Sequence, residues 1–293
     1  MMRVPEIVLE QISFAAGDVE LDNRNVVPEK TIAATGFAKR RVVKKGTSVL
    51  DLASRAVAGI PASGLADVGA VVSATFSSEN RFPSLSVALA SRLGLSSDIP
   101  MIDLQMACSA FPYAAYVASR LSADSGKKVL LIDGDVQSSL CDETDLSTAP
   151  LFSDAVSASL VSVGDGEPSD VAFFNRASSA LQCGPSGPIT MDGFGVFSFV
   201  SSEVAPFLKN FLDKSGNPAV DAFVPHQANM YMVRQLARSL ALTDKLVTSG
   251  EEFANPGSAS IPLTIAYRNV KGRVLIAGFG AGLSASAAIV TVR

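Results

Sequence analysis

The sequence predicts an α/β protein built in layers. Segments with helical spacing of apolar residues alternate with short apolar runs typical of strands along most of the chain. Hydrophobic residues make up 48% of the 293 residues and charged residues only 18%, so the chain can cover a sheet on both faces. Glycine and alanine are frequent in the strand-like runs, which favours close packing between the layers.

The two periodicities assign the elements in order. The first part of the chain has expected strands at 6–15, 70–76, 127–135 and 151–163, helices at 49–60, 82–93 and 111–121, and an extended run at 100–106. After a polar break at 164–170 the pattern restarts, with strands at 171–178, 221–224 and 273–278 and helices at 196–214, 229–240 and 261–269. Residues 274–292 are uncharged, but their small residues and the GFGAG break predict two buried strands joined by a turn rather than a membrane span.

Composition excludes several classes of function. The net charge of −4 gives no overall attraction to nucleic acid or to an anionic membrane. Cys108, Cys141 and Cys183 have no spacing typical of a disulfide framework, and the single histidine argues against a zinc site of His and Cys. We therefore expect no metal and no bound cofactor. An odd, small number of cysteines and the absence of a signal-like run at residues 1–11 favour the cytoplasm.

Cys108 lies at an expected junction between a strand and a helix. Its neighbours Ala107 and Ser109 are small, so the backbone can turn sharply and present the thiol at the start of the helix. The helix dipole at that position favours the thiolate, the nucleophilic form of cysteine. Cys108 is thus a candidate nucleophile. The alternative is a small, buried apolar residue.

Two further residues complete a candidate site. His226 follows an apolar run and precedes a helix, so it would lie at the rim of a sheet, as Cys108 does. Asn255 lies in a loop of small residues, and its amide can donate to an oxyanion without changing charge. A thiolate nucleophile needs such groups for its protons and for developing charge. The alternatives are a histidine satisfied in the core or at the surface, and an asparagine in a turn or helix cap.

Four segments in order carry a family resemblance. They are residues 103–113 around Cys108, 224–229 (VPHQAN), 255–262 (NPGSASIP) and 278–283 (GFGAGL). The chain resembles the ketoacyl-ACP synthase III family of condensing enzymes in the thiolase superfamily, from about Gly36 to its end. The resemblance implies a thiolase-like five-layer αβαβα fold built from two similar halves. The first half, 1–165, would carry Cys108, and the second half, 166–293, would carry His226 and Asn255.

The resemblance also implies a role for each residue. Cys108 would take an acyl group from a thioester, with the N–H groups of Cys108 and Ala281 as the oxyanion hole. His226 and Asn255 would stabilise the enolate left when a malonyl-type extender loses CO₂. Phe279 would pack beside the nucleophile and exclude water, and Phe82 and Phe111 would help to form the acyl pocket.

Substrates and partners follow from the same resemblance. The donor would be acyl-CoA or acyl-ACP, the extender malonyl-ACP or malonyl-CoA, and the protein a homodimer. Lys30 and Ala34 stand where the family usually has the Trp and Arg that grip coenzyme A, and the chain has no Trp. The choice between acyl-CoA and a carrier-bound acyl donor is therefore left open. A replacement phosphate patch is offered by Lys39, Arg40, Arg41, Lys44 and Lys45. Arg234 and Arg238 offer a patch for acyl carrier protein, and the alternative for both is an ordinary solvated surface.

Three functions are compatible with these residues. The first is a condensing enzyme in fatty acid or specialised metabolite biosynthesis. The second is an acyltransferase on the same scaffold that forms an ester or amide without decarboxylation. The third is a non-catalytic partner subunit that binds acyl chains, which the presence of Cys108 disfavours. Acyl chain length cannot be read from the sequence.

Overall fold

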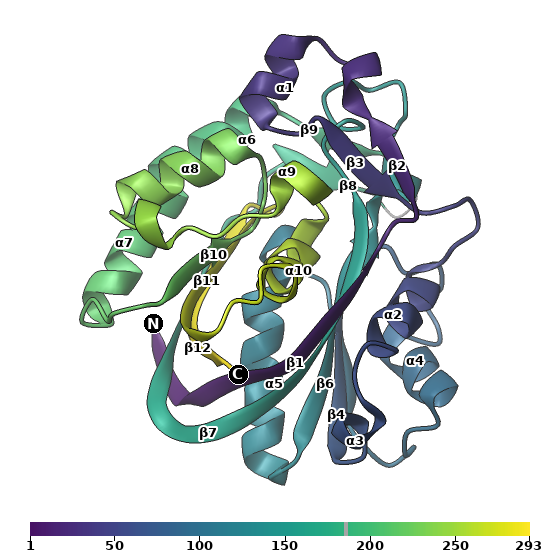
Figure 1. Cartoon of the computed structure of the whole chain (residues 1–293), viewed down its shortest axis with the longest axis vertical. Helices are drawn as coiled ribbons and strands as arrows, with labels where there is room; N and C mark the ends of the chain where they lie inside the picture. The colour runs from purple at the N-terminus through teal and green to yellow at the C-terminus, as the bar shows by residue number, and fades with distance from the viewer. Residues whose placement is uncertain (185–186) are drawn as a thin grey trace.

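One large mixed sheet forms the frame of the computed structural model, which describes residues 1–184 and 187–293 (Figure 1). Its strand order is β10-β11-β12-β1-β7-β6-β4-β5. In chain order these strands are β1 (Met2–Ala16), β4 (Val68–Ala74), β5 (Met101–Leu104), β6 (Lys128–Val136), β7 (Asp154–Asn175), β10 (Ala222–Pro225), β11 (Gly272–Gly280) and β12 (Ser284–Val292). Two small hairpin-like pairs lie outside it, β2 (Val19–Asp22) with β3 (Lys39–Val42), and β8 (Leu181–Cys183) with β9 (Ile189–Met191).

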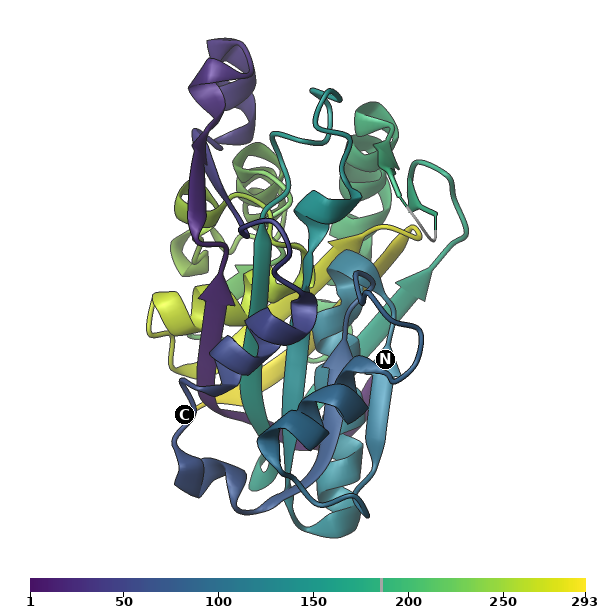
Figure 2. The same ribbon diagram turned by 90° about the vertical axis from the view of Figure 1, so that its right-hand side faces the viewer.

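The helices divide into a central pair and two outer groups. Between the two wings of the bent sheet lie α5 (Ala110–Ser125) and α10 (Ser260–Tyr267) (Figures 1 and 2). Outside one wing are α2 (Val49–Val57), α3 (Ala62–Leu65) and α4 (Leu85–Leu93); outside the other are α6 (Gly193–Phe199), α7 (Ala205–Lys214) and α8 (Met230–Ser239). The short helices α1 (Glu29–Thr35) and α9 (Gly250–Phe253) lie near the same end as the β2–β3 pair. The expected five-layer order is therefore confirmed.

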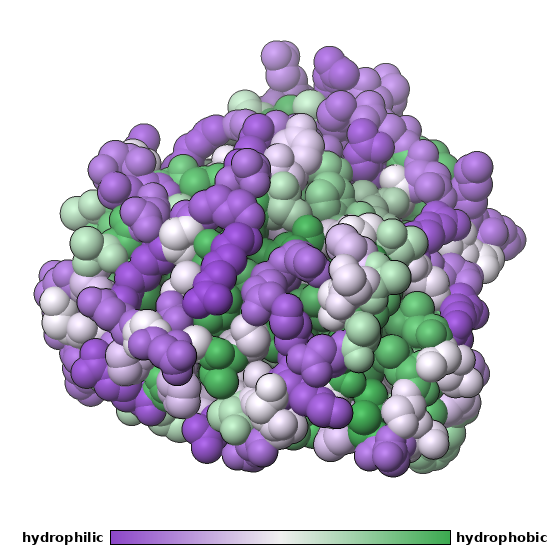
Figure 3. Space-filling view, turned by 60° about the horizontal axis from the view of Figure 1, so that its bottom comes forward, coloured by the Kyte–Doolittle hydropathy of each residue, from purple (hydrophilic) through white to green (hydrophobic). Residues whose placement is uncertain are grey.

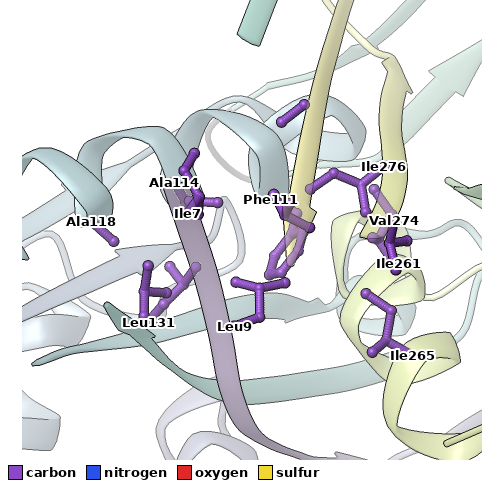
Figure 4. Packing of buried hydrophobic residues seen from close by; sticks show 14 of the residues in the cluster. Ile7, Leu9, Phe111, Ala114, Ala118, Leu131, Ile261, Ile265, Val274 and Ile276 are labelled. Atoms are coloured by element: carbon purple, nitrogen blue, oxygen red, sulfur yellow. The ribbon is translucent and has the colours of Figure 1, made fainter. Parts of the chain in front are cut away.

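Three apolar clusters hold these layers together. The central cluster joins α5 and α10 to both wings: Ile7 and Leu9 of β1, Phe111 of α5, Ile261 of α10 and Ile276 of β11 pack together (Figure 4). A second cluster packs α2 and α4 on β4, β6 and β7, and a third packs α7 and α8 on β10, β11 and β12. Each fully buried Leu, Ile or Phe in them stabilises the fold by roughly 1.5–3 kcal/mol.

The sequence predicts a break in the strand pattern at the polar segment 164–170, but the structure has no break there. Strand β7 runs unbroken from Asp154 to Asn175 and pairs antiparallel with β1 along most of its length. The polar side chains satisfy backbone groups of the partner: Ser169 Oγ accepts from the N–H of Ile7, and Glu6 accepts from the N–H of Gly166. The boundary between 1–165 and 166–293 consequently falls inside one strand, and the division into two similar halves stays a prediction.

The other predicted elements agree with the structure to within a few residues. The run 274–292 forms β11 and β12, two buried antiparallel strands. In the described part of the chain, no helix is long and apolar enough to cross a membrane. The face seen in Figure 3 carries hydrophilic side chains over most of its area, with apolar ones gathered in patches between them.

Candidate active site

Cys108 lies on a tight turn between β5 and α5. The turn is a 3₁₀ segment, Ala107–Ser109, and Cys108 is only 4% exposed. Strand β11 passes directly over it: a Cβ on Gly280 would lie 2.8 Å from Cys108 Cβ, and Gly280 has φ = +150°. Ser109 Oγ fixes the turn by donating to the carbonyl of Met106 at 2.9 Å. The predicted strand-to-helix position of the thiol is therefore observed.

Burial, rather than the helix dipole, dominates the chemistry of this thiol. Desolvation raises the pKa of Cys108 to about 12. The backbone N–H groups of Ala281 and Cys108 contact the sulfur and oppose this rise, without outweighing it. The sequence-based expectation of a stabilised thiolate is wrong for this site. These are the two N–H groups predicted to form the oxyanion hole.

His226 is held at the end of β10 by one ring nitrogen. Its Nδ1 lies 2.9 Å from the carbonyl oxygen of Gly257 and 2.9 Å from Ser260 Oγ. A carbonyl can only accept, so Nδ1 carries the proton and Nε2 is left as an acceptor. Burial lowers the pKa of His226 to about 4, so the ring is neutral at pH 7. The edge of the imidazole packs against Phe279, with ring centroids 5.5 Å apart at 78°.

Asn255 is oriented by residues around it. Its Oδ1 accepts from the N–H of Gly257 at 2.9 Å, which assigns Nδ2 to the other side of the amide. Nδ2 has only a long contact, 3.5 Å, to the carbonyl of Ala228, so it can still donate to a ligand. The backbone carbonyl of Asn255 accepts from Gln137 Nε2 at 3.0 Å. Sequence reasoning missed Gln137, and its only signal is that it directly follows a buried strand.

One cavity brings these side chains together. It has a volume of about 170 Å³, and Cys108, His226, Asn255 and Phe279 all line it. A larger cleft of about 1020 Å³ also reaches Cys108, and its apolar wall residues include Phe76, Leu104 and Met106. Phe152 and Leu181 line both spaces. The nucleophile therefore stands where two spaces meet. A thioester can approach through one space while its acyl chain occupies the other.

Two predicted pocket residues lie elsewhere. Phe111 is fully buried in the central cluster, because the start of α5 faces the interior between the two wings. Phe82 is 90% exposed and lines neither space of its own chain. The assignment of both residues to the acyl pocket of the single chain is therefore corrected.

Most of the predicted carrier-binding arginines already have partners. Arg40 donates to Asn23 Oδ1 at 2.6 Å and is half-buried, so burial lowers its pKa. Arg41 donates to Glu20 at 3.1 Å, and Arg234 pairs with Glu251. Arg238 is exposed in the last turn of α8. Arg40 and Arg41 thus each have a partner within the chain, and the carrier-binding role of the four arginines stays a prediction.

Metal ligands do not gather in the described residues. Within 1–184 and 187–293, no group of three or more His, Cys, Asp or Glu side chains is placed to hold an ion.

Comparison with known proteins identifies the relatives of this chain. Two family models match: 3-oxoacyl-[acyl-carrier-protein] synthase III over residues 102–179, and the C-terminal part of the same enzyme over residues 214–292. The beta-ketoacyl-[acyl-carrier-protein] synthase III 2 of Streptomyces coelicolor is 34% identical over 275 residues, which cover 87% of this chain and 83% of the relative.

Solved structures of synthases and ketosynthases have the same fold as this chain. A 3-oxoacyl-(acyl-carrier protein) synthase from Burkholderia xenovorans superimposes with a TM-score of 0.90, covering 99% of this chain and 95% of that chain; at 24% identity it supports the fold alone. The priming β-ketosynthase of the R1128 polyketide pathway has a TM-score of 0.86 at 27% identity, covering 99% of this chain and 98% of that chain.

Proposed function

The chain belongs to the 3-oxoacyl-[acyl-carrier-protein] synthase III family, and from this premise we propose that it joins an acyl group held on Cys108 to a malonyl-type extender. The observation that carries the proposal is the shared cavity, in which a thiol, a neutral imidazole and an amide face one small space. The reaction is a decarboxylative Claisen condensation in fatty acid or specialised metabolite biosynthesis. We place it in the cytoplasm, where the three free cysteines stay reduced.

The first step is an acyl transfer. Cys108 Sγ attacks the carbonyl carbon of an acyl thioester, a new C–S bond forms and the bond to the carrier sulfur breaks. The thiol proton passes to Nε2 of His226 and from there to the departing thiolate. The N–H groups of Cys108 and Ala281 stabilise the oxyanion, and each such donor contributes roughly 3 kcal/mol. The high pKa of the resting thiol makes this proton acceptor necessary.

The second step needs a sink for negative charge. When the malonyl thioester loses CO₂, the electron pair of the broken C–C bond forms an enolate, and Asn255 Nδ2 donates to its oxygen. The carbanion then attacks the acyl carbon and expels the Cys108 thiolate as the 3-oxoacyl product forms. The step consumes one proton. Taken up from solvent at Nε2, that proton lets His226 donate to the enolate oxygen and then passes to the Cys108 thiolate to restore the thiol. Phe279 shields the carbanion from water.

The preferred donor is acyl carrier protein rather than coenzyme A. Lys30 and Ala34 are exposed on α1, which packs beside α8, so neither a stacking ring nor a guanidinium stands at these two positions. Arg40 and Arg41 are held by Asn23 and Glu20. Acyl-ACP should therefore load Cys108 at least about tenfold faster than the matching acyl-CoA. Equal rates with the two donors would contradict this preference.

The active form is a homodimer. β5 is an edge strand of the sheet, and its unpaired backbone groups invite a second strand. Phe82 lies in the loop before α4, near the cleft that opens beside β5, and is 90% exposed. Sedimentation equilibrium should give twice the mass of one chain. Phe82→Asp should dissociate the dimer, whereas Phe194→Asp, at a ring 80% exposed on α6, should not. A monomeric parent would overturn the assignment.

Intact-protein mass spectrometry tests the function. The protein is mixed with a panel of acyl-CoA and acyl-ACP donors and then with malonyl-ACP. An acyl adduct that is absent from Cys108→Ala and that malonyl-ACP discharges as a 3-oxoacyl product is the expected result. An adduct that malonyl-ACP leaves untouched would favour the acyltransferase, and no adduct with any donor would favour the non-catalytic subunit.

A further inference from the structure

Asp133 is a buried acid that the reaction above does not use. It lies on β6 with 0% exposure, one strand residue away from Gly134 and two away from Asp135. Its Oδ1 accepts from Ser258 Oγ at 2.6 Å, and its Oδ2 has no hydrogen-bond partner in the described chain. Asp135, by contrast, accepts from Thr75 Oγ1, Ser77 Oγ and two backbone N–H groups. The side chain of Asp133 therefore has one hydrogen bond, to a residue 125 positions away.

One hydrogen bond compensates the buried carboxyl group of Asp133 only in part for its lost hydration. A carboxylate in a dry interior needs several donors to offset the loss of hydration, and Asp133 has one. Burial accordingly raises the pKa of Asp133 well above its usual range. The side chain of Asp133 thus acts through one hydrogen bond, to Ser258. Its amide counterpart, asparagine, should therefore be able to replace it.

Ser258, the partner of Asp133, lies in the turn that orients the catalytic groups. It is the middle residue of the 3₁₀ segment Gly257–Ala259, directly before α10. Gly257 accepts from His226 Nδ1 through its carbonyl and donates to Asn255 Oδ1 through its N–H. Ser260, two residues after Ser258, also contacts His226 Nδ1. Any movement of this turn reorients both the imidazole and the amide.

We propose that Asp133 is a positioning residue that, through Ser258, fixes the Gly257–Ala259 turn against β6 and so aims His226 and Asn255 at the space beside Cys108. The tie connects the strand that ends near the nucleophile to the loop that supplies both charge-stabilising groups. The effect of the Asp133–Ser258 bond on the rate of decarboxylation rests on the proposed function. Its effect on the orientation of His226 does not.

The test compares Asp133→Ala and Ser258→Ala with Asp133→Asn. The first two remove the bond from either end, and the third keeps a group of similar size that can still bond Ser258. Ser159→Ala is the matched control, because Ser159 is a fully buried serine of β7 whose hydroxyl has no partner in the described residues. Should Asp133→Ala fail to fold, Ser258→Ala examines the same bond alone.

Two measurements are made on each variant. The first is kcat for decarboxylation of malonyl-ACP, expected to fall about tenfold in Asp133→Ala and Ser258→Ala, with no further fall in the double variant and with KM unchanged. Asp133→Asn and Ser159→Ala should stay within about twofold of the parent. The second is the ¹⁵N spectrum of the imidazole, which is unambiguous because His226 is the only histidine.

The spectrum separates this inference from the proposed function. The parent should show a neutral ring protonated at Nδ1, and exchange of that proton with water should quicken about tenfold in Asp133→Ala and not in Asp133→Asn. An Asp133→Ala protein with parental exchange and parental kcat would overturn the proposal, as would an Asp133→Asn protein as impaired as Asp133→Ala. If the parent protein does not decarboxylate malonyl-ACP, the proposed function is wrong. The ¹⁵N spectrum alone would then test the positioning role of Asp133.

Discussion

At the scale of the residue, the site combines groups that are all uncharged at rest. Burial raises the pKa of Cys108 to about 12 and lowers that of His226 to about 4, so neither side chain is charged at pH 7. A site of this kind keeps its charge-stabilising donors free of a resident ion pair. Negative charge then appears only when a substrate supplies it, where preorganised donors act most strongly.

The neutral thiol can be tested by alkylation. In the Cys141→Ala/Cys183→Ala double variant, Cys108 is the only thiol, and its rate with iodoacetamide should keep rising with pH without a plateau below about pH 10. The reason is that the thiolate fraction keeps growing until the pH reaches the raised pKa. A plateau near pH 7 would mean that a thiolate is stabilised at rest, as the helix dipole alone would suggest.

Replacing Asn255 should slow only one of the two half-reactions. Asn255→Ala should slow malonyl-ACP decarboxylation by about 10²–10³-fold, since it removes one donor to the enolate oxygen. Acyl loading of Cys108, measured by mass spectrometry on the same protein, should stay within about threefold of the parent. His226→Ala is the informative comparison and should slow both steps, because Nε2 also accepts the thiol proton. An Asn255→Ala protein that condenses at the parental rate would remove Asn255 from the mechanism.

At the scale of the element, the close passage of β11 over the Cys108 turn sets the geometry. The sequence predicts the strand, the turn and the helix separately, and all three are found. Periodicity does not predict the contact between residues 108 and 280, which the folded sheet brings together. Only the family resemblance implied that residues 279 and 281 lie beside Cys108. For β7, by contrast, the sequence-based prediction was wrong. The polar residues in its middle predict a break, but β7 pairs with β1 on both sides of them and is one continuous strand.

Gly280→Ala probes this passage. The new methyl group would meet Cys108 Cβ at 2.8 Å and Sγ at 3.2 Å, so the nucleophile has to move. A displacement of even 1 Å can cost about 10²-fold, and loading of Cys108 should fall by that order. Gly94→Ala is the control, because Gly94 also has a positive φ but meets no atom within 4 Å. Loading of Gly280→Ala at the parental rate would show that β11 and the Cys108 turn can move apart enough to fit the methyl group.

At the scale of the whole molecule, the bent sheet brings three distant segments to one cavity. The motifs identify Cys108, His226 and Asn255, but their exposure, their pKa values and the roles of Gln137 and Asp133 depend on what the folded chain packs around them. Sequence reasoning placed Phe111 and Phe82 in the pocket because it cannot tell which way a side chain points. Burial of His226 also links the site to global stability.

The depressed pKa of His226 predicts a pH dependence of unfolding. The unfolded chain binds a proton at His226 near pH 6.5 and the folded chain only near pH 4, so stability from this group is complete above pH 6.5 and is lost as the pH falls. Asp133, Asp135 and Asp154 have raised pKa values and act in the opposite sense, so a difference measurement is needed. Between pH 7 and pH 5 the parent should lose about 2 kcal/mol relative to His226→Gln in urea unfolding. A difference independent of pH would contradict a buried neutral imidazole.

The most direct measurement of the central claim is a single turnover of isolated acyl-enzyme with malonyl-ACP labelled with ¹³C in its free carboxyl group. We expect one labelled CO₂ and one 3-oxoacyl-ACP for each acyl group lost from Cys108, with no adduct and no 3-oxoacyl-ACP from Cys108→Ala. Loss of the acyl group without labelled CO₂, or release of CO₂ without a 3-oxoacyl product, would contradict it.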